Sequence, residues 1–220
     1  MEAFDCGIAD FSDFLIAETD DRAFRESRKQ KKAENRAIRT RLAHQASRAK
    51  SELELKTLLP AEIADGESWH VISQGDIDSL SYLSHVLQHS QADYVLLSTW
   101  CMASADVEAL DAWLDSGTIG RFDAYVGEIF PAHDELCRIA RTAGGRVAVF
   151  RNHSKVMLAA LKSGAKIVVE SSANINTNPR TEQTAITRCA PLFDYYKDFF
   201  DRVKSLNRNF DEWIPYGPPS

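Results

Sequence analysis

Short apolar runs alternate with amphipathic segments along the last two thirds of the chain. The runs are rich in β-branched and aromatic residues, which is typical of buried strands. We expect strands at residues 69–73, 94–99, 122–127, 146–150, 155–159, 166–171 and 184–187. We expect helices at residues 77–89, 105–115, 132–143 and 192–206. This alternation predicts an α/β domain with a mixed, mostly parallel β-sheet flanked by helices.

The connection between two of these strands is short enough to define how they pair. The sequence LKSG separates the run at 155–159 from the run at 166–171. A tight connection containing glycine favours an antiparallel hairpin. The two strands are therefore expected to lie side by side.

The first 60 residues have a different character. Residues 1–21 carry seven acidic side chains and no basic one, and form an acidic N-terminal segment. Residues 22–58 contain no glycine or proline, which favours a long helix that ends before Pro60. The sequence thus predicts a basic helical arm at 22–60 and an α/β domain at 61–220. Where the arm packs at all, the expected contacts are Leu42, Leu53, Leu55 and Leu58.

Charge is distributed unevenly along the 220 residues. The net charge is −6, yet residues 22–50 hold eleven lysines and arginines against two glutamates. Such asymmetry suggests an anionic partner, and nucleic acid is the one expected. The candidate nucleic-acid-binding residues are Arg28, Lys29, Lys31, Lys32, Arg36, Arg39 and Arg41. A solvated helix that contacts no partner is the alternative.

The sequence gives no sign of export or membrane insertion. No apolar run approaches the roughly 18 residues of a membrane span, and the N-terminus is acidic where a signal peptide would be basic. The four cysteines are widely scattered, which indicates reduced thiols. We therefore expect a soluble cytoplasmic protein with no membrane partner.

The chemistry is concentrated around the predicted hairpin. Residues two apart in a strand point to the same face, so His153 and Lys155 are expected to project together. Hairpin pairing brings Ser171, Ser172 and Asn174 within reach of the same point. A neutral imidazole can attack phosphorus, while a lysine and hydrogen-bond donors offset charge on the phosphate oxygens. The set predicts a site for a phosphate diester.

These residues also match a family pattern. The sequence HSK, followed by SSAN and then Glu182, resembles the signature of the phospholipase D superfamily. The resemblance implies that His153 is the nucleophile and forms a phosphohistidine, and that Lys155, Ser172 and Asn174 hold the phosphate. It implies that Glu182 hydrogen-bonds the far nitrogen of His153 and fixes its tautomer. The pattern from about 68 to 190 also looks like one repeat of that fold.

The resemblance carries further expectations for the site. Arg180 lies on the loop that would rim it and is a second phosphate-binding candidate. The family's chemistry needs a nucleophile and a general acid, which are two histidines, and this chain has one HxK. A homodimer with the active site on its two-fold axis supplies the second. No metal and no other cofactor are expected.

The function expected is a metal-independent phosphodiesterase, a nuclease acting at a dimeric HxK site. One alternative is a catalytically inactive phospholipase D-like protein that binds nucleic acid or serves in assembly, since Ala160 stands where the family usually has an aspartate. Another is a phosphodiesterase for lipid or nucleotide. His85 and His89 have a zinc-compatible spacing but no third ligand in the sequence. Trp69 and Trp100 are expected in the core, with base stacking as the alternative for Trp100.

Overall fold

The structure is a computed structural model in which residues 48–128, 133–142, 144–176, 180–206 and 213–217 are described. The chain forms two compact units, residues 1–43 and residues 44–220, and all of the described residues belong to the second unit. The acidic segment at 1–21 and the seven candidate basic residues between 28 and 41 lie outside the described residues. The domain limits expected at 21 and 60 stay predictions.

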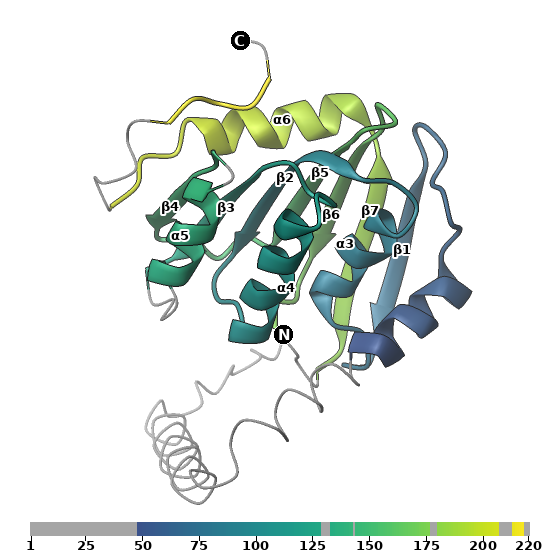
Figure 1. Ribbon diagram of the computed structural model, residues 1–220. Coiled ribbons are helices and arrows are strands. Elements are labelled where there is room, and N and C mark those ends of the chain that lie inside the picture. Colours follow the sequence, from purple (N-terminus) through teal and green to yellow (C-terminus); the bar gives the residue numbers. More distant parts are fainter. Residues whose placement is uncertain (1–47, 129–132, 143, 177–179, 207–212, 218–220) are drawn as a thin grey trace, which may run out of the picture. The chain divides into compact units, whose positions relative to one another are not determined.

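One seven-stranded sheet forms the centre of the described unit (Figure 1). Its strands are β1 (Ser68–Ser73), β2 (Ala92–Thr99), β3 (Phe122–Gly127), β4 (Val147–Phe150), β5 (Val156–Leu161), β6 (Lys166–Ser171) and β7 (Glu182–Arg188). Their spatial order is β1-β7-β6-β5-β2-β3-β4. All seven expected strands are present, and the α/β class is confirmed.

The direction of the strands corrects one expectation. Only β2, β3 and β4 run parallel to one another, whereas β5 pairs antiparallel with β2 and β6, and β7 pairs antiparallel with β6 and β1. The sheet is mixed, but it is not mostly parallel. The connections β4–β5 and β5–β6 contain no helix, so the chain reverses at these points instead of crossing over. The hairpin at LKSG is confirmed, with Gly164 at φ 88° in its turn.

Helices cover both faces of the sheet. They are α3 (Ser79–Leu87), α4 (Ser104–Asp115), α5 (His133–Thr142) and α6 (Ala190–Asp201), and residues 48–58 form a further helix. Asp78 caps α3 by accepting a hydrogen bond from the backbone nitrogen of Leu80 at 2.9 Å. Figure 1 shows α6 lying across the sheet on the side opposite α3 and α4.

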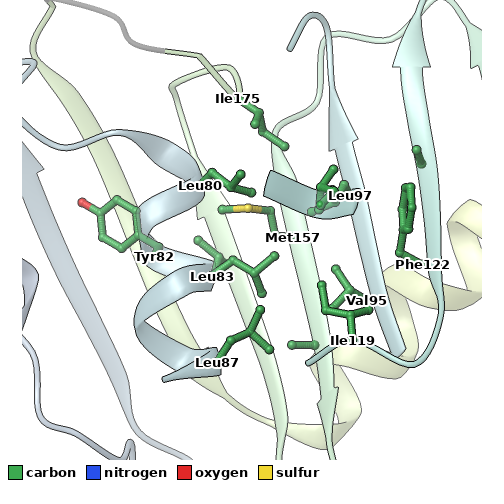
Figure 2. Close-up of a cluster of buried hydrophobic side chains, with 14 of the residues drawn as sticks. Leu80, Tyr82, Leu83, Leu87, Val95, Leu97, Ile119, Phe122, Met157 and Ile175 are labelled. Carbon is green, nitrogen blue, oxygen red and sulfur yellow. The ribbon is translucent and has the colours of Figure 1, made fainter. Parts of the chain in front are cut away.

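Alternation along the strands builds two separate cores. On β2, Val95 and Leu97 face the helices α3 to α5, and Figure 2 shows them with Leu80 and Leu83 of α3. Tyr94 on the same strand faces the opposite side and packs with α6. Because both faces are buried, β2 reads as a continuous apolar run in the sequence.

The helix at 48–58 packs against the domain through Leu55, as expected, but not through Leu53 or Leu58. Leu55 is fully buried, whereas Leu53 and Leu58 are 66% and 46% exposed. The buried stripe is Ser51, Leu55 and Leu59, four residues apart, which share one face of a helix. Ser51 Oγ donates to the carbonyl oxygen of Asp76 at 2.9 Å, a contact that apolar counting does not anticipate. Leu42 lies outside the described residues.

Two further expectations change in the structure. Trp69 and Trp100 are 36% and 39% exposed, so neither is a core residue. Within the described part of the chain, no helix has the length and apolar character needed to cross a membrane.

Candidate functional site

The buried side chain of Asn152 fixes the segment that carries the HSK sequence. Its amide nitrogen lies 3.0 Å from Ser98 Oγ, 3.2 Å from the carbonyl oxygen of Thr99 and 2.8 Å from that of Tyr125. Its amide oxygen accepts from the backbone nitrogen of Ser154 at 2.9 Å. The loop between β4 and β5 is therefore tied to the ends of β2 and β3, where both strands stop.

His153 and Lys155 lie together at this end of the sheet. Lys155 Nζ is 2.9 Å from Nδ1 and 3.4 Å from Nε2 of His153, and it donates to the His153 carbonyl oxygen at 2.6 Å. His153 is exposed and Lys155 is half-buried. Both residues precede β5, which begins at Val156, so a loop and not the expected strand presents them.

The loop after β6 brings the serine cluster to the same end. The backbone nitrogen of Ser171 donates to the carbonyl oxygen of Lys155 at 3.0 Å, which extends the hairpin to the lysine itself. The Ser172 hydroxyl donates to the Glu182 carboxylate. The Ser172 backbone nitrogen donates to the Gln183 carbonyl oxygen at 2.9 Å, and the Gln183 backbone nitrogen donates to Ser172 Oγ at 3.0 Å. The hairpin thus brings the residues that follow β6 to the end of β5 that adjoins Lys155, and the charge of Glu182 acts on Lys155.

Thr99 connects the end of β2 to the asparagine of the SSAN sequence. Its hydroxyl accepts from the backbone nitrogen of Ile175 at 3.1 Å and donates to the carbonyl oxygen of Cys101 at 2.8 Å. The same oxygen lies 3.5 Å from Asn174 Oδ1. Asn174 is half-buried. These contacts hold the segment that contains Asn174 at the end of β2.

The electrostatics centre on Lys155. Burial lowers the pKa of Lys155, and electrostatic interactions with Cys101 and Glu182 raise it in part. Burial raises the pKa of the Cys101 thiol, and the charge of Lys155 partly offsets this. A partly desolvated cation interacts more strongly with an anion than a solvated one does. The site is therefore suited to an anionic group that approaches Lys155.

One predicted site residue remains, and two residues near the site were not predicted. Arg180 is exposed, in the loop between Ile175 and β7. The sequence interpretation did not name Asn152 or Thr99 as site residues. The one sequence signal for Asn152 is its position, a polar amide directly before HSK and after a buried strand. Thr99 gives no such signal, because it reads as the last residue of a strand.

The described residues contain no group of three His, Cys, Asp or Glu side chains arranged to hold a metal ion. His85 and His89 meet edge to face, with ring centres 5.7 Å apart. His85 is buried, and its Nε2 lies 2.9 Å from the carbonyl oxygen of Pro60. This pairing explains His85 as a packing residue that ties α3 to the chain after the helix at 48–58.

The sequence matches no protein-family model and no curated protein sequence. Among solved structures, a polyphosphate kinase from Porphyromonas gingivalis is similar at 19% identity and a TM-score of 0.47 over 69% of this chain. Nuc, a phospholipase D family member from Salmonella typhimurium, is similar at 13% identity and a TM-score of 0.44 over 62%. A yeast tyrosyl-DNA phosphodiesterase is similar at 8% identity and a TM-score of 0.39 over 55%. The matched regions span 28%, 93% and 32% of those chains, respectively.

Proposed function

We propose that this protein is a metal-independent phosphodiesterase of the phospholipase D type, a nuclease that cuts nucleic acid through a phosphohistidine. The observation that carries the proposal is the meeting of His153, Lys155, Ser172 and Glu182 at one end of the sheet, from two strand pairs. An exposed imidazole beside a lysine and a serine supplies a nucleophile and donors for a phosphate.

The proposed reaction begins at the exposed imidazole. A nitrogen of His153 forms a bond to phosphorus, and the bond from phosphorus to the leaving oxygen breaks. Lys155 is within hydrogen-bond distance of the ring and so lies next to any phosphate that the ring attacks. Its charge offsets the negative charge that redistributes over the non-bridging oxygens.

Further donors are proposed to hold the phosphate. Ser172 is exposed and Asn174 half-buried in the segment after β6, and Arg180 is exposed before β7. In the structure, the Ser172 hydroxyl donates to the Glu182 carboxylate. When a substrate phosphate binds Ser172 instead, Glu182 is proposed to hydrogen-bond the ring nitrogen of His153 that does not attack. A carboxylate in that role fixes which nitrogen is free to attack.

A second histidine is proposed to come from a second copy of the chain. The leaving oxygen needs a proton, and the water that later breaks the phosphorus–nitrogen bond must lose one. A two-fold homodimer that joins two HSK loops gives each phosphohistidine an acid and base in the His153 of the other copy. His153 of the other copy then serves as both the acid and the base, and the reaction needs no further residue of this chain.

The proposal does not depend on the aspartate that the family usually has at the position of Ala160. Ala160 lies in β5 opposite Tyr94 and packs in the core beneath α6. At about 3.3 Å per residue, the five residues from Lys155 to Ala160 span roughly 16 Å. Its side chain therefore belongs to the packing of the sheet, at a distance from the phosphate site.

The second candidate function is a non-catalytic one. A chain that stays monomeric would keep Lys155 and Ser172 as phosphate-binding groups without the second histidine. It would bind nucleic acid or serve in assembly. The basic residues Arg28 to Arg41 are proposed to contact phosphates in either case, since lysines and arginines bind nucleic acid largely through its backbone. A lipid or nucleotide diester is the remaining alternative substrate.

Cleavage in EDTA tests the catalytic proposal. Purified protein is incubated with single- and double-stranded DNA and RNA, beside His153→Ala and the matched control His70→Ala, which removes an exposed histidine on β1. The proposal predicts cleavage in the wild type and in His70→Ala, and loss of cleavage in His153→Ala. Cleavage that survives in His153→Ala contradicts it, and binding without cleavage supports the non-catalytic candidate.

Light scattering coupled to size exclusion tests the dimer. The chain mass is 24.7 kDa, so the proposal predicts a particle of twice that mass at micromolar protein concentrations. A monomer across that range contradicts the shared site.

A further inference from the structure

An exposed tryptophan lies directly beside His153. Trp100 follows the last residue of β2 and is 39% exposed, so part of its indole is open to a ligand. The centres of the Trp100 and His153 rings are 5.9 Å apart, with the planes tilted by 44°. The two rings therefore meet at an angle, without stacking face to face.

The position of Trp100 is fixed by its surroundings. A Cβ on Gly127 would come within 2.6 Å of Trp100 Cδ1 and 2.7 Å of its carbonyl oxygen, so the indole rests on β3 only because residue 127 is glycine. Asn152, which holds the HSK loop, also donates to the carbonyl oxygen of Thr99, one residue before Trp100. The same buried amide thus positions both the indole and the imidazole.

A rigid, half-exposed indole next to a phosphate site fits one chemical group well. Nucleobases are flat and stack on aromatic side chains, which contributes about 1–3 kcal/mol per base in proteins that bind single strands. A lipid chain would need a continuous apolar surface, but the imidazole next to Trp100 lies within hydrogen-bond distance of the Lys155 ammonium group. A rigid ring also loses little conformational entropy when a base stacks on it.

We propose that Trp100 is the stacking surface for an unpaired nucleobase adjoining the phosphate at His153, which makes single-stranded nucleic acid the preferred substrate. The inference rests on the proposed phosphate site. Bases within a duplex are already stacked on their neighbours, and exposing one costs a few kcal/mol. Single strands present bases without that cost.

A double-mutant cycle between protein and ligand tests the inference through binding alone. All variants are made in the full-length His153→Gln chain, so that cleavage does not interfere. The probes are a short single-stranded oligothymidylate and an abasic strand with the same number of phosphates, which equalises counterion release. The protein changes are Trp100→Ala, Trp100→Phe and the control Trp69→Ala, which removes an equally exposed tryptophan from β1. In the sheet, β7 and β6 separate β1 from β5.

Trp100→Ala is expected to weaken binding of the oligothymidylate by about 5- to 150-fold and to leave binding of the abasic strand unchanged. Trp100→Phe should retain most of the affinity, and Trp69→Ala all of it. Equal losses for both strands overturn the inference, as does an unchanged affinity for the oligothymidylate or no binding of it by the parent chain. Base-dependent binding without cleavage by the wild type would overturn the catalytic proposal alone.

A second measurement covers the case in which Trp100→Ala does not fold. Stacking of a base on an indole quenches its fluorescence, so oligothymidylate should quench the parent chain more than Trp100→Phe. Identical quenching of the two overturns the inference.

Discussion

Replacing Asn152 by alanine tests the claim that one buried amide organises the site. The amide nitrogen has two hydrogens to share among three oxygens, those of Ser98, Thr99 and Tyr125. The amide oxygen accepts from both the backbone nitrogen and the hydroxyl of Ser154. Four bonds are therefore lost in Asn152→Ala, and the two carbonyl oxygens lose a partner inside the protein.

The size of the effect follows from these bonds. Each hydrogen bond contributes about 0.5–1.5 kcal/mol net, so the full set is worth about 2–6 kcal/mol. Ser154 is exposed, and water can replace its two bonds, which reduces the expected loss to about 1–3 kcal/mol. Urea denaturation with linear extrapolation measures it as a lower midpoint at an unchanged slope. Cleavage should fall further than the unfolded fraction accounts for, because His153 loses its fixed position.

Ser154→Ala is the matched control. It removes the hydroxyl bonds to Ser98 and Asn152 but leaves the bonds made by the Asn152 amide nitrogen. We expect a loss below about 1.5 kcal/mol. If Asn152→Ala costs no more than Ser154→Ala, Asn152 does not organise this end of the sheet.

Three further outcomes follow from the structure. Gly127→Ala forces Trp100 away from β3 and should cost about 1–3 kcal/mol in a urea titration, so an unchanged midpoint would refute the close packing. Burial, and then the charge of Asp78, raise the pKa of Asp106 to about 7. Between about pH 4 and 7 the folded state therefore keeps a proton on Asp106 that the unfolded state has lost, so the free energy of unfolding falls as pH rises through this range. Asp106→Asn should remove this part of the pH dependence, and an equal pH dependence of stability in both proteins would refute the raised pKa. Burial lowers the pKa of Lys155, so as pH rises, activity should begin to fall at a pH lower than the usual lysine pKa of 10.5. Lys155→Arg should move this fall to higher pH, and a fall at the same pH in both proteins would exclude Lys155 as its cause.

The sequence predicted the elements better than their arrangement. Strand positions follow from local apolar runs, and the hairpin follows from Gly164 in a short turn. The pairing of β2 with β5 joins residues about 60 apart, and neither strand carries a signal for it. Alternating helices and strands suggested parallel crossovers, but the helix-free connections after β4 and β5 reverse the chain.

The hairpin could be predicted from the sequence, and with it the approach of the HSK and SSAN sequences to each other. Lys155 and Ser171 are joined by a backbone hydrogen bond because β5 and β6 are consecutive in the chain and pair with each other. Asn152 and Thr99 act through long-range backbone bonds, which no local pattern encodes. Trp100 was misplaced because an aromatic residue at a strand end resembles a core residue in sequence, and its exposure depends on the loops around it.

Trapping the covalent intermediate tests the central claim most directly. A labelled single-stranded oligonucleotide is mixed with the wild type, with His153→Ala and with His70→Ala in EDTA. The reaction is quenched under denaturing, alkaline conditions, and the protein is then digested and its peptides are analysed by mass spectrometry. The account predicts a phosphoryl-oligonucleotide adduct on the peptide that contains His153, present in the wild type and in His70→Ala and absent from His153→Ala. Cleavage without that adduct, or an adduct on another residue, would contradict it.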